Sequence, residues 1–186
     1  ISLRFDPAAR TLLHCMDVTV RTGSTKAGSD LFLTSLELTS ANGETVCFVL
    51  EVHSDEREAA TVERESEMII RHALLETEGD PSERLDDTLK EMNGLLKGML
   101  VARAINDVHM LIGILDREGT LHVSHAGRAE AYLVRKGVAS QITEYSGKPT
   151  PAFVHIASGA LQAGDAVILS TQRLLRSLTP AQLATH

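Results

Sequence analysis

Glu51, His53 and Asp55 are the residues whose types and spacing most directly suggest chemistry. Side chains alternate between the two faces of a β-strand, so a strand that continued through Asp55 would place all three on one face. Two carboxylates and an imidazole on one face can hold Zn²⁺ or another transition metal. The alternative is a strand that ends here and passes into a helix, with Ser54 or Asp55 as its N-cap. We favour the second interpretation.

Two largely apolar segments carry polar residues, Arg128, Gln172 and Arg173, that have no negative charge. Arg128 follows Gly127 in the segment GRAEAYL at residues 127–133, and Arg173 follows Gln172 in the segment GDAVILSTQRLL at residues 164–175. Arginine has no hydrogen-bond acceptor and stays protonated, while glutamine offers only a neutral oxygen. Neither residue type can therefore serve as an anionic ligand of a cation.

Four segments, in their order along the chain, resemble the motifs of the metal-dependent protein serine/threonine phosphatases of the PPM family. KAGSDLFL stands in place of N-E-D, and FVLEVHSD in place of F-x-V-x-D-G-x-G-G. AGRAEAYL stands in place of V-G-D-S-R-A-Y-L, and GDAVILSTQRLL in place of G-D-x-L-L-L-x-[ST]-D-G-L. Spacing and flanking strands agree from about residue 12 to residue 178, so the resemblance covers nearly the whole chain.

The chain departs from the family at its metal-binding positions. The resemblance implies two divalent cations held by aspartates, because Mg²⁺ and Mn²⁺ prefer oxygen ligands. Glu51 takes the place of the bridging aspartate, and Val52 that of the glycine that binds through its carbonyl. The other family positions that have changed hold Arg128, Gln172 and Arg173, whereas Asp30 keeps its family identity.

Loss of these carboxylates implies a phosphatase scaffold without phosphatase chemistry. A dinuclear centre supplies the nucleophilic hydroxide and neutralises the phosphoryl oxygens, so both effects vanish with the cations. If the family fold holds, Arg128 and Arg173 converge with Glu51. They would then form an internal salt bridge that replaces the cation, or bind an anion such as a phosphorylated side chain.

The elements that position these residues follow from hydrophobic patterning and turn signals. Strands are predicted at residues 12–21, 30–39 and 45–53, the last two joined by a turn at Asn42–Gly43. Two helices follow, over residues 55–78 and from Asp80–Pro81 onward. Further strands are predicted at 108–115, 121–126, 129–135, 153–156 and 166–170, with a short helix after Thr179.

This order indicates one α+β domain over residues 1–186. The resemblance implies a four-layer αββα sandwich of two antiparallel sheets flanked by helices. The sequence ends at His186, before any strand that would carry the family's remaining metal aspartate. Whether the sandwich has its last strand is therefore left open.

Composition excludes several classes of function. The formal net charge is −7, much of the acidity lies between Glu51 and Glu91, and aromatic residues make up only 3%. We therefore expect no nucleic-acid binding. No apolar run approaches the ~18 residues of a membrane span, so we expect no membrane association and a cytoplasmic location. Cys15 and Cys47 lie in apolar runs without metal-ligand spacing, which predicts buried reduced thiols.

These observations lead to one preferred function and two alternatives. We expect an intracellular signalling module, a catalytically inactive pseudophosphatase without a metal cofactor, which regulates by binding a protein partner. The first alternative is a diverged phosphatase that retains activity with Mn²⁺ or Mg²⁺, using Glu51, His53, Asp55 and Asp30 around one metal. The second is an oligomerisation module, which would need an exposed apolar patch on the helix of residues 57–76.

Overall fold

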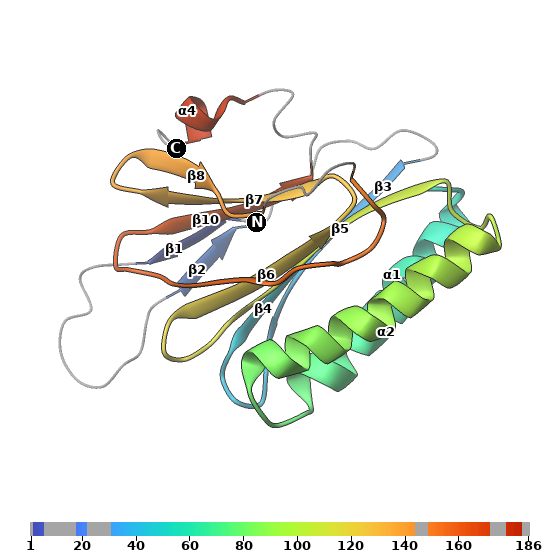
Figure 1. Cartoon of the computed structure of the whole chain (residues 1–186), viewed down its shortest axis with the longest axis horizontal. Coiled ribbons are helices and arrows are strands. Elements are labelled where there is room, and N and C mark those ends of the chain that lie inside the picture. The colour runs from blue at the N-terminus through green and yellow to red at the C-terminus, as the bar shows by residue number, and fades with distance from the viewer. Residues whose placement is uncertain (1, 6–17, 22–30, 144–148, 172–177, 184–186) are drawn as a thin grey trace.

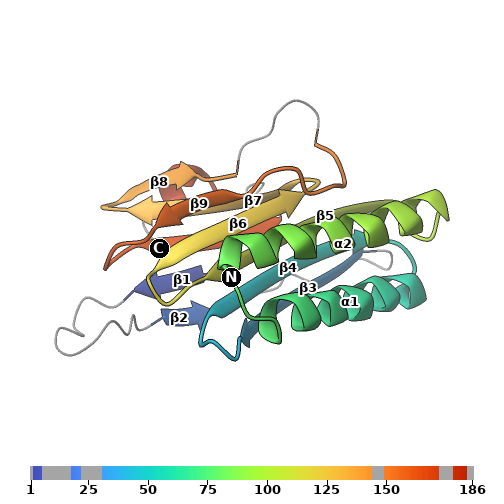
Figure 2. The same cartoon turned by 60° about the horizontal axis from the view of Figure 1, so that its bottom comes forward.

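Two five-stranded antiparallel sheets pack face to face, and two long helices cover the outer face of one of them (Figures 1 and 2). The computed structural model describes residues 2–5, 18–21, 31–143, 149–171 and 178–183. The first sheet has the order β2-β1-β10-β7-β8, and the second has the order β3-β4-β5-β6-β9. The predicted α+β sandwich of two antiparallel sheets is thus confirmed.

The strands have the following bounds. The first sheet contains β1 (Ser2–Phe5), β2 (Val18–Arg21), β7 (Ala129–Arg135), β8 (Val138–Gln141) and β10 (Ala166–Thr171). The second contains β3 (Leu31–Thr39), β4 (Thr45–His53), β5 (Asp107–Leu115), β6 (Thr120–Ala126) and β9 (Ala157–Ala160).

The helices begin where the sequence provides caps. Asp55 precedes α1 (Glu56–Ile70) and accepts the backbone N–H of Glu58, and α1 continues into one π-helical turn, η1 (Arg71–Leu75). Asp80 precedes α2 (Pro81–Val101) and accepts two backbone N–H groups of its first turn. Both caps satisfy donors that have no partner within the helix. No helix in the described part of the chain is long and apolar enough to cross a membrane.

Strand β4 divides the hydrophobic core into two parts. Its even-numbered residues, such as Phe48 and Val52, pack against the helices, whereas Cys47 and Val49 pack between the two sheets. Because both faces are covered, β4 reads as a nearly continuous apolar run. The same alternation directs Glu51 and His53, at the end of β4, into the space between the sheets.

Some predicted elements differ from the structure. The strand expected at residues 153–156 is a connection, and the strand β9 follows it immediately. The side chain of Asn93 on α2 holds Phe153 there, donating to its carbonyl at 2.9 Å and accepting its N–H at 2.8 Å. The short strands β1 and β8 were not predicted. In the described residues the second helical layer consists of α4 (Pro180–Leu183), beside β8 (Figure 1).

We expect the thiol of Cys47 to be chemically inert in the folded protein. Cys47 is 2% exposed, and burial, helped by the Glu37 carboxylate, raises its pKa to about 12. Because the thiolate is the reactive form, alkylation by iodoacetamide in a Cys15→Ser variant should be at least about a hundredfold slower than that of an exposed cysteine. Ala102→Cys, at an exposed position in a chain lacking the other two cysteines, is the matched control. Equal labelling rates would contradict this expectation. Cys15 itself lies outside the described residues.

Candidate functional site

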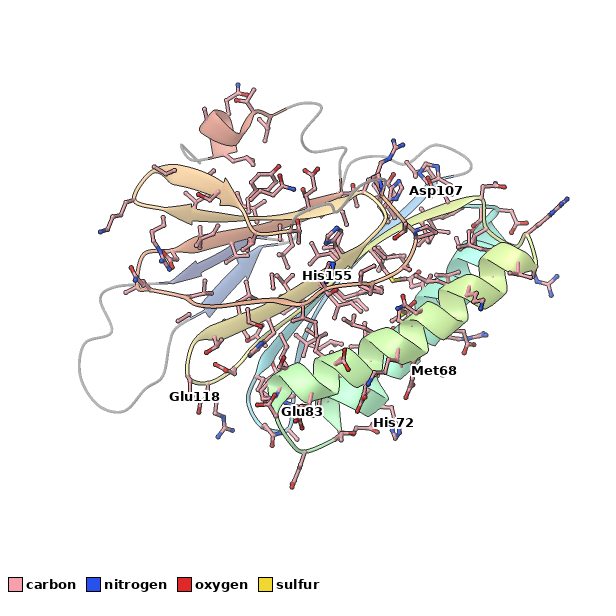
Figure 3. All side chains as sticks on the ribbon, viewed as in Figure 1. Met68, His72, Glu83, Asp107, Glu118 and His155 are labelled. Carbon is pink, nitrogen blue, oxygen red and sulfur yellow. The ribbon has the colours of Figure 1, made fainter. Side chains whose placement is uncertain are left out.

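Glu51, His53 and His109 form a cluster between the sheets. In the antiparallel pair of β4 and β5, Glu51 lies directly opposite His109, and His53 lies opposite Asp107. One ligand atom from each of the three residues lies within 4.8 Å of the others. Glu51 is 3% and His109 7% exposed, whereas the side chain of His53 is 34% exposed. The cluster therefore opens to solvent beside His53. Figure 3 marks this end of β5 by Asp107.

The two imidazoles of the cluster differ in their surroundings. Nε2 of His53 lies 3.0 Å from Oε1 of Glu51, and the His53 and His109 rings meet edge to face with centroids 5.7 Å apart. Burial lowers the pKa of His109, although the carboxylates of Asp107 and Glu51 oppose this effect. Burial thus favours the neutral form of the His109 imidazole.

The turn between β6 and β7 closes over His109. Gly127 has φ +67°, and a Cβ atom there would lie 2.3 Å from the Val108 carbonyl oxygen and 2.5 Å from Nδ1 of His109. Without a side chain at this position, the backbone approaches the ring closely. The Arg128 N–H then donates to Nδ1 of His109 at 3.2 Å.

The predicted salt bridge between Arg128 and Glu51 is not formed. Arg128 is exposed, and the ion pairs within the described residues do not join it to Glu51. Arg128 lies in the turn before β7, whereas the neighbouring Ala129 packs into the core between the sheets. Arg128 thus contributes its backbone to the cluster, while its charge faces solvent.

The other predicted site residues lie in different places. Val52 is buried against the helices, on the opposite face of β4 from Glu51. Asp55 is exposed and caps α1, as the preferred interpretation of this segment predicted, so it is not part of the cluster. Asp30, Gln172 and Arg173 lie outside the described residues.

His109 is the cluster residue that the sequence analysis missed. Its only local signal is its position in the apolar run DVHMLIGIL, where residues 109 and 111 share a face. The pairing of β5 with β4, which brings it opposite Glu51, joins segments separated by two helices.

The donor set indicates which cations the cluster suits. One carboxylate and two imidazoles match the ligands that Zn²⁺ and other transition metals prefer. Mg²⁺ and Mn²⁺ prefer sets made mostly of oxygen, and a pair of them needs several carboxylates. Within the described residues the cluster therefore suits a single transition metal better than a pair of Mn²⁺ ions.

Comparison with known proteins identifies the fold. The structure is similar to a serine/threonine phosphatase of S. agalactiae, with a TM-score of 0.67 and 13% identity over 88% of this chain and 81% of that one. It is also similar to the phosphatase PstP/Ppp of Mycobacterium tuberculosis, with a TM-score of 0.60 and 14% identity over 100% of this chain and 85% of that one.

Two further solved structures are related in the same way. PppA of Pseudomonas aeruginosa, described as a key regulatory component of T6SS, has a TM-score of 0.59 and 14% identity over 84% of this chain and 83% of that one. The catalytic domain of PstP in complex with two manganese ions has a TM-score of 0.59 and 13% identity, over 83% of each chain. No protein-family model matches the sequence, and no curated protein matches it significantly. The chain has the fold of the PPM-type serine/threonine phosphatases.

Proposed function

We propose that this domain is a catalytically inactive module with a phosphatase fold, which regulates by binding another protein. One observation carries the proposal: the place of the family's bridging aspartate holds Glu51 beside two imidazoles, and not a group of carboxylates. Arg128, in place of another family aspartate, directs its cationic side chain to solvent.

Phosphoryl transfer explains why this substitution matters. Phosphatases with two metals use the cations to generate hydroxide and to neutralise charge on the phosphoryl oxygens. Glu51 is the only carboxylate in the cluster that the described residues form. A single anionic ligand compensates too little charge to keep two divalent cations close together.

The regulatory part of the proposal draws on a protein of the same fold and on surface charge. PppA is described as a regulatory component, which is consistent with regulatory use of the scaffold. On α2 the exposed carboxylates of Glu83, Asp86 and Asp87 lie around an open hollow beside Ile156 (Figure 3 labels Glu83). Among the described residues of this hollow they outnumber the one cation, Lys90, which pairs with Asp86 and Asp87. Such a surface favours a partner that presents basic residues.

A diverged metal-dependent phosphatase is the second candidate, and the cluster of Glu51, His53 and His109 favours it because these residues can hold a cation. An oligomerisation module has less support. Met68, at 51%, is the one strongly exposed large apolar residue described on α1 or η1 (Figure 3). A single residue gives no continuous apolar patch.

Hydrolysis of p-nitrophenyl phosphate tests the proposal. We expect no turnover that depends on Mn²⁺ and on Glu51, so the wild-type protein and Glu51→Gln should have the same background rate. Glu118→Gln, in the β5–β6 turn at the other end of the sheet from Asp107, is the control (Figure 3). Mn²⁺-dependent turnover that disappears in Glu51→Gln and persists in Glu118→Gln would establish the second candidate instead.

A further inference from the structure

We propose that Glu51, His53 and His109 form a mononuclear site for a divalent transition metal of the Zn²⁺ class, coupled to the turn at Gly127–Arg128. The proposal does not depend on catalytic inactivity, because a cation can be held here with or without phosphatase chemistry. Its support is the convergence of three ligand types from two paired strands.

The backbone already places the three ligands. Glu51 and His53 are two residues apart on β4 and share a face, and His109 on β5 is the register partner of Glu51. Ligand atoms around a tetrahedral Zn²⁺ with bonds of about 2.0–2.1 Å lie roughly 3.3 Å apart. Nε2 of His53 and Oε1 of Glu51 are 3.0 Å apart, and all three ligand atoms lie within 4.8 Å. These separations are close to those that a bound ion requires.

Ligand chemistry and burial select the class of cation. Two imidazoles and one carboxylate form a set that binds Zn²⁺ with a fourth position left for water. Among divalent ions of the first transition row, Mn²⁺ binds such sites most weakly and Cu²⁺ most tightly. Glu51 and His109 are buried while His53 is partly exposed, so the site has a low-dielectric wall and an opening through which a hydrated ion can enter.

Metal binding must disturb the neighbouring turn. Nδ1 of His109 accepts the Arg128 N–H, so the neutral ring carries its proton on Nε2. A cation at Nδ1 would replace that N–H. A cation at Nε2 would require the proton to move to Nδ1, which then could not accept. Either arrangement breaks the hydrogen bond, so the Arg128 amide reports on occupancy.

The test is titration of the full chain with Zn²⁺ alone, followed by calorimetry, and with Co²⁺ alone, followed by its visible absorption. We expect one equivalent of metal to bind. The bound Co²⁺ should show the intense absorption bands typical of four or five ligands. In NMR spectra, the resonance of the Arg128 amide should shift when Zn²⁺ is added. Glu51→Gln and His53→Ala should each weaken Zn²⁺ binding at least about tenfold, since loss of even outer-shell partners costs 10–100-fold. His53→Ala is at a partly exposed strand end and keeps the test valid if a buried variant fails to fold.

His72→Ala is the matched control, because His72 and Glu76 form an exposed histidine–carboxylate pair on the helical layer (Figure 3). This variant should bind Zn²⁺ as the wild-type protein does. Three results would overturn the proposal: unchanged Zn²⁺ affinity in both Glu51→Gln and His53→Ala, an Arg128 amide that does not respond, or two Mn²⁺ ions bound more tightly than Zn²⁺. Phosphatase assays on the same samples test the proposed catalytic inactivity independently of Zn²⁺ binding.

Discussion

Replacing Glu44 with alanine is expected to lower the free energy of unfolding by about 3–5 kcal/mol, because it leaves the buried guanidinium of Arg84 without its carboxylate. Glu44 is 6% and Arg84 5% exposed, and Nη2 of Arg84 donates to Oε1 of Glu44. Ser40 donates to the other carboxylate oxygen of Glu44 at 2.7 Å. A charge this far from water depends on its partner, so its loss costs much more than loss of a surface pair.

The pair also fastens the helical layer to the sheet. Glu44 lies in the turn between β3 and β4, whereas Arg84 lies in the first turn of α2. Nη1 of Arg84 donates to the carbonyl oxygens of Leu74, in η1, and of Thr77, in the connection to α2, at 2.8 Å and 3.1 Å. Loss of Glu44 therefore weakens the contact between the β3–β4 turn, α2 and the segment that precedes α2.

Urea denaturation measures the effect. Lys90→Ala is the control, because its ion pairs with Asp86 and Asp87 are exposed to solvent and should contribute little to stability. The double replacement Glu44→Leu with Arg84→Met should recover much of the loss, since no unpaired charge remains. If Glu44→Ala and Lys90→Ala are equally stable, the buried pair does not have this role.

Gly127→Ala should be the second strongly destabilising change, at about 2–5 kcal/mol. The left-handed conformation costs a non-glycine residue about 1–2 kcal/mol, and forcing an atom into a packed site costs about 1–3 kcal/mol more. At φ +67° the new Cβ would lie 2.3 Å from the Val108 carbonyl oxygen and 2.5 Å from Nδ1 of His109. The turn must therefore move away from β5.

Gly137→Ala separates the two contributions. Gly137 has φ +75°, and nothing lies within 4 Å of the position of its Cβ atom. Only the conformational cost applies there, so thermal unfolding should place Gly137→Ala between the wild-type protein and Gly127→Ala. If both variants lose the same amount of stability, the close contact of Gly127 with His109 adds nothing to the cost of the substitution.

Local signals in the sequence predicted most elements correctly. Asn42–Gly43 forms the turn before β4, with Gly43 at φ +74°, and Asp80 caps α2 as predicted. The choice between strand and cap for Asp55 also followed from short-range chemistry, because a carboxylate before a polar helix start satisfies exposed N–H groups. Caps and turns depend on residues that are close together in the chain, so they can be recognised in a single sequence.

Features that depend on long-range pairing were not predictable. The alternation of β4 places Glu51 and His53 on one face, but only the register with β5 adds His109. Arg84 and Glu44 are 40 positions apart, and no pattern marks them as partners. The place of Arg128 depends on the turn at the left-handed Gly127, which lies close to Val108 and His109 of β5.

The division of the core by β4 has a consequence for cooperativity. Residues of this one strand contribute to both cores, with Phe48 on one side and Cys47 on the other. Detachment of either the helical layer or the first sheet would expose one apolar face of β4 to solvent. Separation of β4 itself would disrupt both cores. Partial opening is therefore confined to the sheet edges and short outer elements, and the central strands open only when the whole domain unfolds.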